Sequence, residues 1–515
     1  MHSSLESSKA YQAVNPITGL TLSEAFMFST KQEIDATLVE SMRAFDIVRA
    51  MPSIARAVLL EEIAGQLFAQ KGAIVERAAL ETGLSAENRL SGELDRTCAV
   101  LRIFAAAVRS GDVQDVRITT ADPSRTPKPR PDVRRMRVGI GPVVVIEASN
   151  FPLAFGIIGG DAGSALAAGC PVIAKVHPFH PGTSALIAEA VQIALAKTGI
   201  PSGFFAAIHG RGEETISLVQ HPLTRGVGFT GSRTVGMVLR RAANDRSRPL
   251  DELSLEMGSL NPVFFLPGAL ARRGSELASG LVEAVLLGGG QFCTKPGNVF
   301  VPTGGEGDAF LKALSSAFQR TTSPTLLSPR FAEQYRHSCK ALLDLPGVSV
   351  LARGEEESLS ASSARPLLVV TDPETFMREP LLREEVFGPF SVVVQGPTEV
   401  LTELALQVEG ELTATIHAAQ DEQLSAARLA SALAAKVGRL LFDGFSPGVE
   451  LCDGINHSGP WPSALGRSTV VGTTSYERWL RPLCYQDTPA NLLPPELAPD
   501  NPLDLCRRVD ETCEF

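Results

Sequence analysis

The feature that most constrains the fold is an alternation of short β-branched runs with helical stretches between Val138 and Phe229. Runs such as "GPVVVIEA", "CPVIAKV" and "GVGFTGS" are separated by segments such as "TSALIAEAVQIALAKTG". Short strands followed by helices, with glycines at the junctions, are typical of βαβ units and a parallel sheet. The pattern therefore predicts a doubly wound α/β fold, in which "EASNFP", "KVHP" and "FTGS" meet at the carboxyl ends of the strands.

A second α/β stretch extends from about Leu255 to Phe442, and residues 31–112 have the apolar periodicity of helices. At 515 residues the chain exceeds the size at which a single hydrophobic core keeps growing. We therefore expect two large lobes with a site between them. The proline-rich segment 487–515 is predicted to lie extended over the surface.

The charge balance argues against a nucleic-acid partner, since the formal net charge is -10 and phosphate binding needs clustered basic residues. The basic segment "RTPKPRPDVRRMRVGIG" is interpreted as an exposed ribbon that joins elements or subunits. No stretch is apolar enough for a bilayer span, and the start lacks the pattern of a secretory signal. We expect a soluble, cytoplasmic protein that acts on small molecules.

The eight cysteines include no CxxC pair and no Cys/His cluster at metal-ligand spacing, so no metal site is predicted. Cys293 lies in the glycine-rich stretch "GGGQFCTKPG". Taken alone, it fits a buried, inert thiol as well as a nucleophile.

Three further residues are ambiguous by themselves. Lys175 ends a predicted strand, where a lysine either reaches solvent or meets an anion. Ser232, which follows Gly231, fits a helix N-cap or a contact to a pyrophosphate. Glu256, in the apolar context "LSLEMG", fits a general base or a carboxylate satisfied by nearby amides. The GxGxxG dinucleotide fingerprint is absent.

Six motifs occur in the order and spacing of one family: "NFP" (150–152), "FTGS" (229–232), "EMGSLNP" (256–262), "GGGQFCT" (288–294), "EEVFGP" (384–389) and "GRS" (466–468). With them, the chain resembles the aldehyde dehydrogenase superfamily from "NPITG" at residue 15 to Gln486. Within that superfamily, "KVHPFHPGTS", "GQFCTKPG" and "RPLCYQ" are most similar to the α-ketoglutaric semialdehyde (2,5-dioxovalerate) dehydrogenases.

The resemblance implies three catalytic roles. Cys293 is expected to attack the aldehyde carbon, and the side-chain amide of Asn150 with the backbone N–H of Cys293 to form the oxyanion hole. Glu256 is expected to activate the water that hydrolyses the thioester. The implied reaction is the NAD(P)-dependent oxidation of α-ketoglutaric semialdehyde to 2-oxoglutarate through a thiohemiacetal and a thioester.

The resemblance also assigns the cofactor contacts. Lys175 is expected at the adenosine ribose, Gly231 and Ser232 at the pyrophosphate, and Glu385 with Phe387 at the nicotinamide ribose and its surroundings.

One departure from the family bears on the choice of cofactor. Many NAD-preferring members carry a glutamate three residues after the strand lysine, where this chain has Pro178. Without that carboxylate a 2'-phosphate is not repelled, and His177, His180 or Arg211 is expected to pair with it. NADP is therefore predicted in preference to NAD.

The substrate's remote carboxylate needs a positive or amide-rich anchor. Arg89 and Arg96 lie near one face of a predicted helix that in this family borders the substrate entrance; the alternative is a solvated helix face with Glu93 as partner. Phe151 and Gln291 are expected to shape the pocket. The role of Lys295 stays open.

The implied architecture is an NAD(P)-binding domain (1–124 and 141–254), a catalytic domain (255–445), a bridging ribbon (125–140 and 468–486) and an extended tail (487–515). A homodimer or homotetramer is expected. The alternatives are a broad-specificity or long-chain aliphatic aldehyde dehydrogenase and, from another class, a non-catalytic structural or binding descendant of the family.

Overall fold

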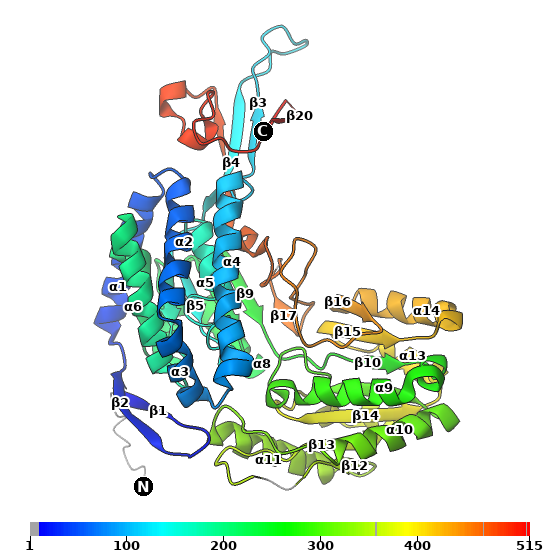
Figure 1. The fold of residues 1–515 in the computed structure, drawn as a ribbon. Coiled ribbons are helices and arrows are strands. Elements are labelled where there is room, and N and C mark those ends of the chain that lie inside the picture. Colours follow the sequence, from blue (N-terminus) through cyan, green and yellow to red (C-terminus); the bar gives the residue numbers. More distant parts are fainter. Residues whose placement is uncertain (1–9, 356–357, 467, 511, 515) are drawn as a thin grey trace.

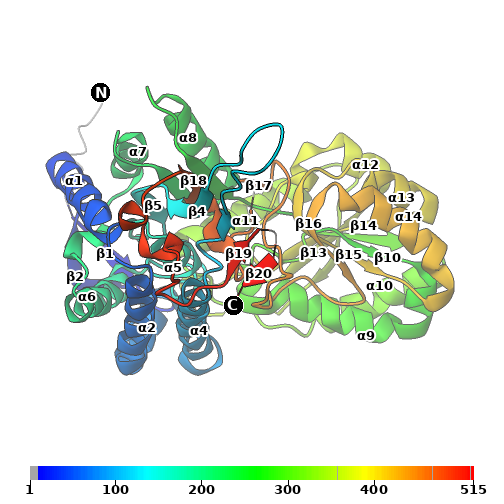
Figure 2. The ribbon, with the colours of Figure 1, turned by 90° about the horizontal axis from the view of Figure 1, so that it is seen from above.

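The computed structural model describes residues 10–514 except 356, 357, 467 and 511. It contains two α/β lobes and a narrow β-ribbon (Figure 1). Seen from above, the lobes lie side by side and the ribbon lies over their junction (Figure 2). The predicted α/β class with two parallel-sheet lobes and a small β element is confirmed.

The first lobe is built on a six-stranded sheet in the order β17-β9-β8-β5-β6-β7. All neighbours are parallel except β17 and β9. Because the chain proceeds outward from β5 in both directions, the sheet is doubly wound and its switch point lies at β5. The strands are β5 (Val143–Ile146), β6 (Val172–Lys175), β7 (Phe205–Ile208), β8 (Gly226–Thr230), β9 (Glu252–Glu256) and β17 (Ala464–Leu465).

The helical prediction for residues 31–112 is confirmed. The apolar residues of α4 and its preceding turn, Leu90, Leu94, Leu101 and Phe104, are all buried. They pack into the core that joins α2, α4 and the sheet. The helices of this lobe are α1 (Lys31–Val48), α2 (Ile54–Ala69), α3 (Lys71–Thr82), α4 (Ser91–Ser110), α5 (Gly160–Ala167), α6 (Pro181–Thr198), α7 (Gly212–Gln220) and α8 (Arg233–Asn244), with a π-helical turn η1 (Ala86–Leu90) and a 3₁₀ turn η2 (Ser202–Phe204).

The second lobe is built on a seven-stranded sheet in the order β12-β13-β14-β11-β10-β15-β16, parallel except for β12 and β13. Its central strands β10, β11, β14 and β15 are buried along almost their whole length, as expected when helices cover both faces. The strands are β10 (Val263–Phe265), β11 (Asn298–Pro302), β12 (Ser349–Arg353), β13 (Leu367–Thr371), β14 (Phe390–Gly396), β15 (Glu411–His417) and β16 (Val437–Phe442).

Helices cover both faces of this second sheet, and the sheet separates the two hydrophobic cores of the lobe. They are α9 (Pro267–Leu286), α10 (Gly305–Phe318), α11 (Pro329–Leu343), α12 (Pro373–Arg378), α13 (Thr398–Ala405) and α14 (Gln423–Ala434), with 3₁₀ turns η3 (Leu287–Gly290), η4 (Pro380–Arg383) and η5 (Gln420–Glu422).

The ribbon is larger than predicted. Its five strands have the order β18-β4-β3-β19-β20. They are β3 (Val116–Thr119), β4 (Val133–Gly139), β18 (Leu480–Gln486), β19 (Arg507–Val509) and β20 (Thr512–Glu514), and β18 follows the 3₁₀ turn η6 (Ser475–Trp479). The predicted boundaries assigned β3 to the cofactor domain and left β19 and β20 in an extended tail.

The tail is therefore only partly extended. Prolines restrict its first part, which has the short turns η7 (Ala490–Leu492) and η8 (Pro495–Leu497). The proline-free end then pairs in parallel with β3, with Arg507 opposite Val116. This pairing satisfies backbone groups on an edge of β3 that would otherwise be open. A separate hairpin of β1 (Ala10–Val14) and β2 (Thr21–Met27) packs against the first lobe.

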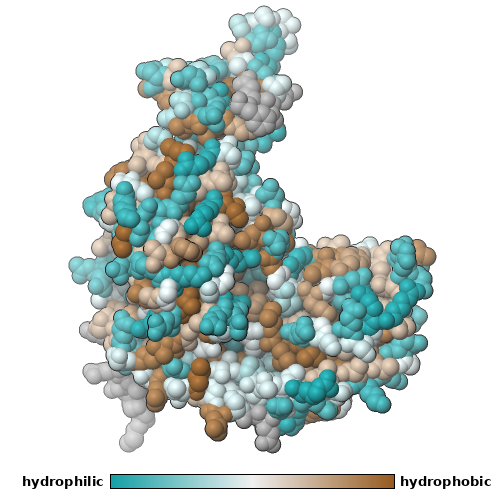
Figure 3. Space-filling model, viewed as in Figure 1, coloured by the Kyte–Doolittle hydropathy of each residue, from teal (hydrophilic) through white to brown (hydrophobic). Residues whose placement is uncertain are grey.

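In the described part of the chain, no helix is long and apolar enough to cross a membrane. The face seen in Figure 3 has hydrophilic and hydrophobic residues interspersed over both lobes.

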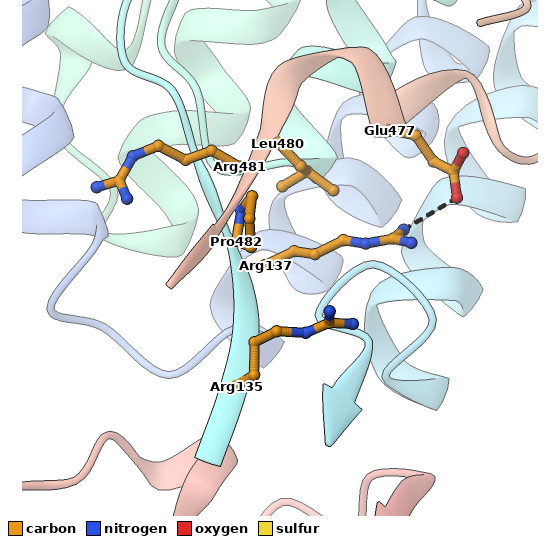
Figure 4. Close-up of a pocket in the computed structure, with 6 residues that line it drawn as sticks. All are labelled: Arg135, Arg137, Glu477, Leu480, Arg481 and Pro482. Carbon is orange, nitrogen blue, oxygen red and sulfur yellow. Dashed lines mark hydrogen bonds and ion pairs between the residues drawn. The ribbon is translucent and has the colours of Figure 1, made fainter. Parts of the chain in front are cut away.

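The ribbon arginines have carboxylate partners. Arg137 Nη1 lies 2.9 Å from Glu477 Oε1, and Arg135 Nη2 lies 3.1 Å from Asp115 Oδ2. A cavity of about 300 Å³ is lined here by Arg135, Arg137, Glu477 and residues of β18 (Figure 4). None of the predicted site residues lines this cavity.

Candidate active site

Four strands of the first sheet end at one rim. Ile146 of β5 pairs with Lys175 of β6, and Thr230 of β8 pairs with Glu256 of β9. The loops after these strands therefore begin side by side, as expected for "EASNFP", "KVHP" and "FTGS". The second lobe brings the Cys293 loop to the same rim through contacts described next.

The Cys293 loop, between η3 and β11, is held by its backbone. The side-chain amide Nδ2 of Asn261 donates to the carbonyl oxygens of Cys293 (2.8 Å) and Lys295 (3.0 Å). Gly290 has φ +70°, and a Cβ there would lie 2.2 Å from the carbonyl oxygen of Gly388. The glycines before Cys293 thus permit a left-handed turn and a close backbone approach that a side chain would block.

Asn150 lies in the loop after β5, and its amide Nδ2 donates to the carbonyl oxygen of Gln291 at 2.8 Å. Arg89 Nη2 in turn donates to the backbone oxygen of Asn150 at 3.3 Å. An amide NH₂ has two hydrogens, and this bond engages one of them. The contact holds the Asn150 amide against the backbone of Gln291, two residues before Cys293. It leaves the second amide hydrogen for another acceptor.

Glu256, the last residue of β9, is fully buried, and its carboxylate lies against the Cys293 thiol, which donates a hydrogen bond to it. His457 Nε2 lies 3.3 Å from Glu256 Oε1 and 3.5 Å from Cys293 Sγ. His457 was missed by the sequence reasoning. It lies in the loop between β16 and β17, in the stretch "GINHSGPWP", which has no periodicity or spacing that marks a functional histidine.

Burial and two neighbouring carboxylates disfavour the thiolate form of Cys293. Burial, followed by the negative charges of Glu256 and Glu385, raises its pKa well above the ordinary 9.0. Since the thiolate is the nucleophile, the thiol needs a proton acceptor within reach.

The sequence predicts no metal site, but three potential metal ligands lie together here. Ligand atoms of Glu256, Cys293 and His457 lie within 4.8 Å of one another, a spacing compatible with an ion as well as with proton transfer. One nitrogen of His457 faces both the carboxylate and the sulfur, and we therefore interpret the three side chains as an acid–base group.

Glu385 and Lys295 form a second buried charge pair. Burial raises the pKa of Glu385 to about 7, opposed by the positive charge of Lys295. Burial lowers the pKa of Lys295 to about 8, and its Nζ donates to the Phe390 carbonyl oxygen at 2.7 Å. Lys295 thus lies inside the scaffold as a counter-charge to Glu385. Glu385 also requires Gly258, because a Cβ there would lie 2.1 Å from its Oε2.

Lys175 ends β6 at the same rim, opposite Ile146 of β5. Burial lowers its pKa to about 8; Glu147 and Glu214 raise it and Arg211 lowers it. Arg211, in the loop before α7, is exposed, with its guanidinium 5.4 Å from the Phe28 ring centroid. Two cations therefore lie close enough to affect each other.

The turn after β8 has the features of an anion-binding helix start. Ser232 is the N-cap of α8 and accepts a hydrogen bond from Val235 N at 3.4 Å. A Cβ on Gly231 would lie 2.7 Å from the Phe229 ring. The buried hydroxyl of Thr230 has no partner among the described residues, so the turn suits a polar ligand at the helix N-terminus.

His177 does not offer the positive charge predicted for it. Burial lowers its pKa well below 6.5, with further contributions from His180 and Lys175, so its imidazole is neutral near pH 7. Its backbone N donates to Glu147 Oε2 at 2.6 Å, and its ring stacks on His180 at 5.3 Å. The burial of His177 and these contacts argue against the predicted ion pair between its imidazole and a 2'-phosphate.

Phe387 ends a row of aromatic rings that crosses between the lobes. Its ring centroid lies 5.7 Å from Phe331, which lies 5.1 Å from Phe179, which lies 4.7 Å from His177. This row joins the Glu385 loop to the Lys175 side of the rim.

Arg89 and Phe151 lie beside the Cys293 loop. The Arg89 guanidinium is 4.1 Å from the ring centroid of Phe151 and 4.9 Å from that of Phe292, the neighbour of Cys293. Arg89 Nε also lies 3.1 Å from Glu93 Oε2. The alternative of a Glu93 partner is present, but the side chain of Arg89 is 22% exposed, so a fully solvated helix face does not describe it.

Arg96 and Gln291 have backbone partners. Arg96 Nη2 donates to the Val449 carbonyl oxygen at 2.7 Å. The buried side chain of Gln291 accepts from Leu327 N at 3.1 Å and donates to the Gly288 oxygen at 3.2 Å. These bonds argue against the predicted contact of Gln291 with substrate: its side chain braces the loop.

Residues 3–440 match the model of the "Aldehyde dehydrogenase family". The chain belongs to the aldehyde dehydrogenase family. Enzymes of this family oxidise aldehydes with NAD or NADP as electron acceptor, and this aldehyde dehydrogenase is an oxidoreductase of that kind. Of the motifs that carried the resemblance, Arg467 in "GRS" lies outside the described residues.

Two relatives are similar over nearly the whole chain. The α-ketoglutaric semialdehyde dehydrogenase 2 of Azospirillum brasilense is 43% identical over 492 residues, which cover 95% of this aldehyde dehydrogenase and 93% of the relative. The α-ketoglutaric semialdehyde dehydrogenase of Acinetobacter baylyi is 40% identical, covering 96% and 93%.

Solved structures share the fold at low identity. PnpE in complex with nicotinamide adenine dinucleotide has a TM-score of 0.77 at 20% identity, covering 93% of this chain and 94% of PnpE. The glyceraldehyde-3-phosphate dehydrogenase GapN of Methanocaldococcus jannaschii, complexed with NADP, also has a TM-score of 0.77, at 18% identity, covering 93% and 99%.

Proposed function

We propose that this aldehyde dehydrogenase oxidises α-ketoglutaric semialdehyde to 2-oxoglutarate. The reaction class rests on one observation: Asn150, Glu256 and Cys293, from three separate segments, converge where the two lobes meet. The choice of substrate is supported by the two relatives of that name, at 43% and 40% identity over almost the full chain.

In the proposed reaction the Cys293 sulfur adds to the aldehyde carbon. The free hydrogen of the Asn150 amide and the backbone N–H of Cys293 donate to the oxygen that becomes negative. When bound, the nicotinamide cofactor accepts the hydride from the substrate carbon, which leaves a thioester on Cys293. Glu256 then takes a proton from the attacking water, and the acid departs as the sulfur regains its electron pair.

For the cofactor, we propose NADP in preference to NAD. Lys175 and Arg211 supply two neighbouring cations, which suits a phosphate dianion, and Pro178 leaves no carboxylate to repel it. The unpartnered Thr230 hydroxyl and the α8 N-terminus at Gly231 and Ser232 suit the pyrophosphate. Glu385 and Phe387 would border the nicotinamide ribose.

On the substrate side, Arg89 is the proposed anchor for the remote carboxylate. It is charged, only partly exposed, and stacked on Phe151 and Phe292 next to Cys293. Arg96, bonded to the loop at Val449, is the weaker candidate.

We further propose a homodimer or homotetramer joined through the ribbon, in which β18 is an edge strand. Light scattering after size-exclusion chromatography gives its mass, and a monomer at micromolar concentration would contradict the proposal. The cytoplasmic location stays a prediction.

The decisive experiment compares initial rates with α-ketoglutaric semialdehyde, succinic semialdehyde and hexanal, each with NADP and NAD. We expect the highest kcat/KM for α-ketoglutaric semialdehyde with NADP. Hexanal as the best substrate would favour an aliphatic aldehyde dehydrogenase. Cys293→Ala should abolish turnover while NADPH still binds, as measured by its fluorescence; persistent turnover would exclude Cys293 as nucleophile.

A further inference from the structure

His457 is a buried titratable side chain to which the proposed reaction gives no role. It is 3% exposed, and one of its two ring nitrogens, Nε2, faces both the Cys293 sulfur and the Glu256 carboxylate. One nitrogen with one hydrogen cannot donate to both groups in full at the same time. Such a shared nitrogen is a natural point for a proton to move.

The Cys293 thiol needs help to ionise in this setting. Burial and the negative charges of Glu256 and Glu385 oppose the formation of a thiolate. The fully buried Glu256 carboxylate accepts a hydrogen bond from the Cys293 thiol. It loses that donor once the thiol ionises, unless His457 carries a proton on Nε2, which lies 3.3 Å from Glu256 Oε1. An imidazolium at His457 would lie between two anions and attract both of them.

We propose that His457 accepts the thiol proton of Cys293 and holds the resulting thiolate as an ion pair. The S–H bond breaks, the sulfur keeps the electron pair, and a new N–H bond forms at Nε2 of His457. The inference rests on the proposed function for the role of Cys293. It divides the work between two groups: His457 prepares the sulfur for attack, and Glu256 stays available for the water that hydrolyses the thioester.

The position of His457 is set by the backbone around it. Its N–H donates to Thr469 Oγ1 at 2.9 Å, and its carbonyl oxygen accepts from Val470 N at 3.0 Å. The loop packs tightly on β16, where a Cβ on Gly438 would lie 1.7 Å from the Ser458 oxygen. The imidazole is thus held against the site by a loop that has little room to shift.

The other charged groups around this nitrogen have partners of their own. Glu385 faces Lys295, and Arg439 of β16 donates to the backbone oxygens of Ser446 and Gly448. Arg439 is also near enough to Cys293 to be affected by its charge. Among the described residues, His457 brings a basic nitrogen, Nε2, to 3.5 Å from the Cys293 sulfur.

The test is the pH dependence of Cys293 alkylation by iodoacetamide in the full chain without cofactor or substrate, quantified by mass spectrometry of the Cys293 peptide. His457→Gln keeps the size and a donor but cannot take the proton. We expect its profile to move to higher pH by one unit or more, so that alkylation at pH 7 slows about tenfold or more, with the same plateau at high pH. His221→Gln, a matched change at a histidine paired with Asp35, should leave the profile unchanged.

Superimposable profiles for the wild type and His457→Gln would overturn the inference. A profile shifted by Glu256→Gln and unmoved by His457→Gln would overturn it as well, in favour of direct transfer to Glu256. If His457→Gln fails to fold, the wild type and Cys293→Ser are compared by thiolate absorbance at 240 nm. A difference titration with its midpoint below the ordinary thiol value of about 8.5 supports the ion pair, and a midpoint at or above that value refutes it.

The outcomes separate this inference from the proposed function. Turnover by Cys293→Ala would refute the proposed nucleophile. Loss of turnover in Cys293→Ala together with an unmoved His457→Gln alkylation profile would leave the proposed function intact and refute the role of His457 alone.

Discussion

Replacing Arg89 by Met tests the proposed anchor for the substrate carboxylate. The change removes the guanidinium that lies over Phe151 and Phe292, while the apolar side chain of Met still fills much of the space. If Arg89 binds the carboxylate, the loss must fall on carboxylated aldehydes more than on neutral ones.

The expected loss in kcat/KM has two parts: one specific to carboxylated aldehydes, and one common to all aldehydes. A hydrogen bond between charged groups contributes about 1.5–3 kcal/mol, so kcat/KM for α-ketoglutaric semialdehyde should fall about 10- to 150-fold relative to hexanal. The common part arises because buried Glu93 loses its partner at 3.1 Å, and Glu93 Oε1 accepts from Leu153 N and Ala154 N in the Asn150 loop. Disturbing that loop should slow both substrates, on the order of several-fold.

The assay is the ratio of kcat/KM for α-ketoglutaric semialdehyde to that for hexanal, because the common part cancels in this ratio. Arg89→Met/Glu93→Gln, which also removes the unpaired carboxylate, should restore part of the rate with hexanal and leave the ratio low. A ratio unchanged from the wild type would refute Arg89 as the anchor. If the ratio fell in Arg96→Met instead, the anchor would be Arg96.

Three further outcomes are expected. Arg211→Ala should raise KM for NADP about tenfold while KM for NAD changes little, since the exposed guanidinium would meet only the 2'-phosphate; equal changes for both cofactors would count against this contact. Glu256→Gln should keep a rapid first turnover of NADPH in stopped-flow absorbance and slow the steady state, and loss of the burst would refute its role in hydrolysis. Glu411→Gln should reduce the increase in unfolding free energy as the pH falls. Burial raises the pKa of Glu411 from 4.5 to about 7, so its ionisation opposes folding above pH 7 and not below pH 4.5. The difference is on the order of 3 kcal/mol, which urea titrations at pH 5 and 8 would detect.

The parts of the fold with strong periodicity were predictable from sequence. The parallel sheet of the first lobe follows from runs such as Val143–Ile146, whose residues are all buried, as strands covered on both faces require. The ribbon edge was missed because pairing of β19 with β3 joins Arg507 to Val116, almost 400 residues apart in sequence, and three-residue strands carry no periodic signal.

The residues of the site also differ in whether the sequence predicted them. Cys293, Asn150 and Glu256 were predicted because each lies in a motif that the chain shares with the aldehyde dehydrogenase superfamily. His457 lies in an irregular loop, and only the tertiary structure brings its Nε2 to 3.5 Å from the sulfur. His177 shows the opposite failure: its position after β6 suggested a cation, whereas burial makes the imidazole neutral, and burial cannot be read from the residue type.

The two buried charge groups of the site differ in what they can do. Burial raises the pKa of Glu385 and lowers that of Lys295, and the opposite charge of each partner counters its shift, so the two groups favour each other's charged form. The group of Cys293, Glu256 and His457 contains a cation only when His457 is protonated. The thiol proton of Cys293 can supply that charge. Proton transfer to His457 leaves the net charge of the group unchanged and supplies Glu256 with a donor. The nucleophile and the carboxylate that later activates water would thus be stabilised by the same imidazolium, and losing His457 should impair the first half of the reaction more than the second.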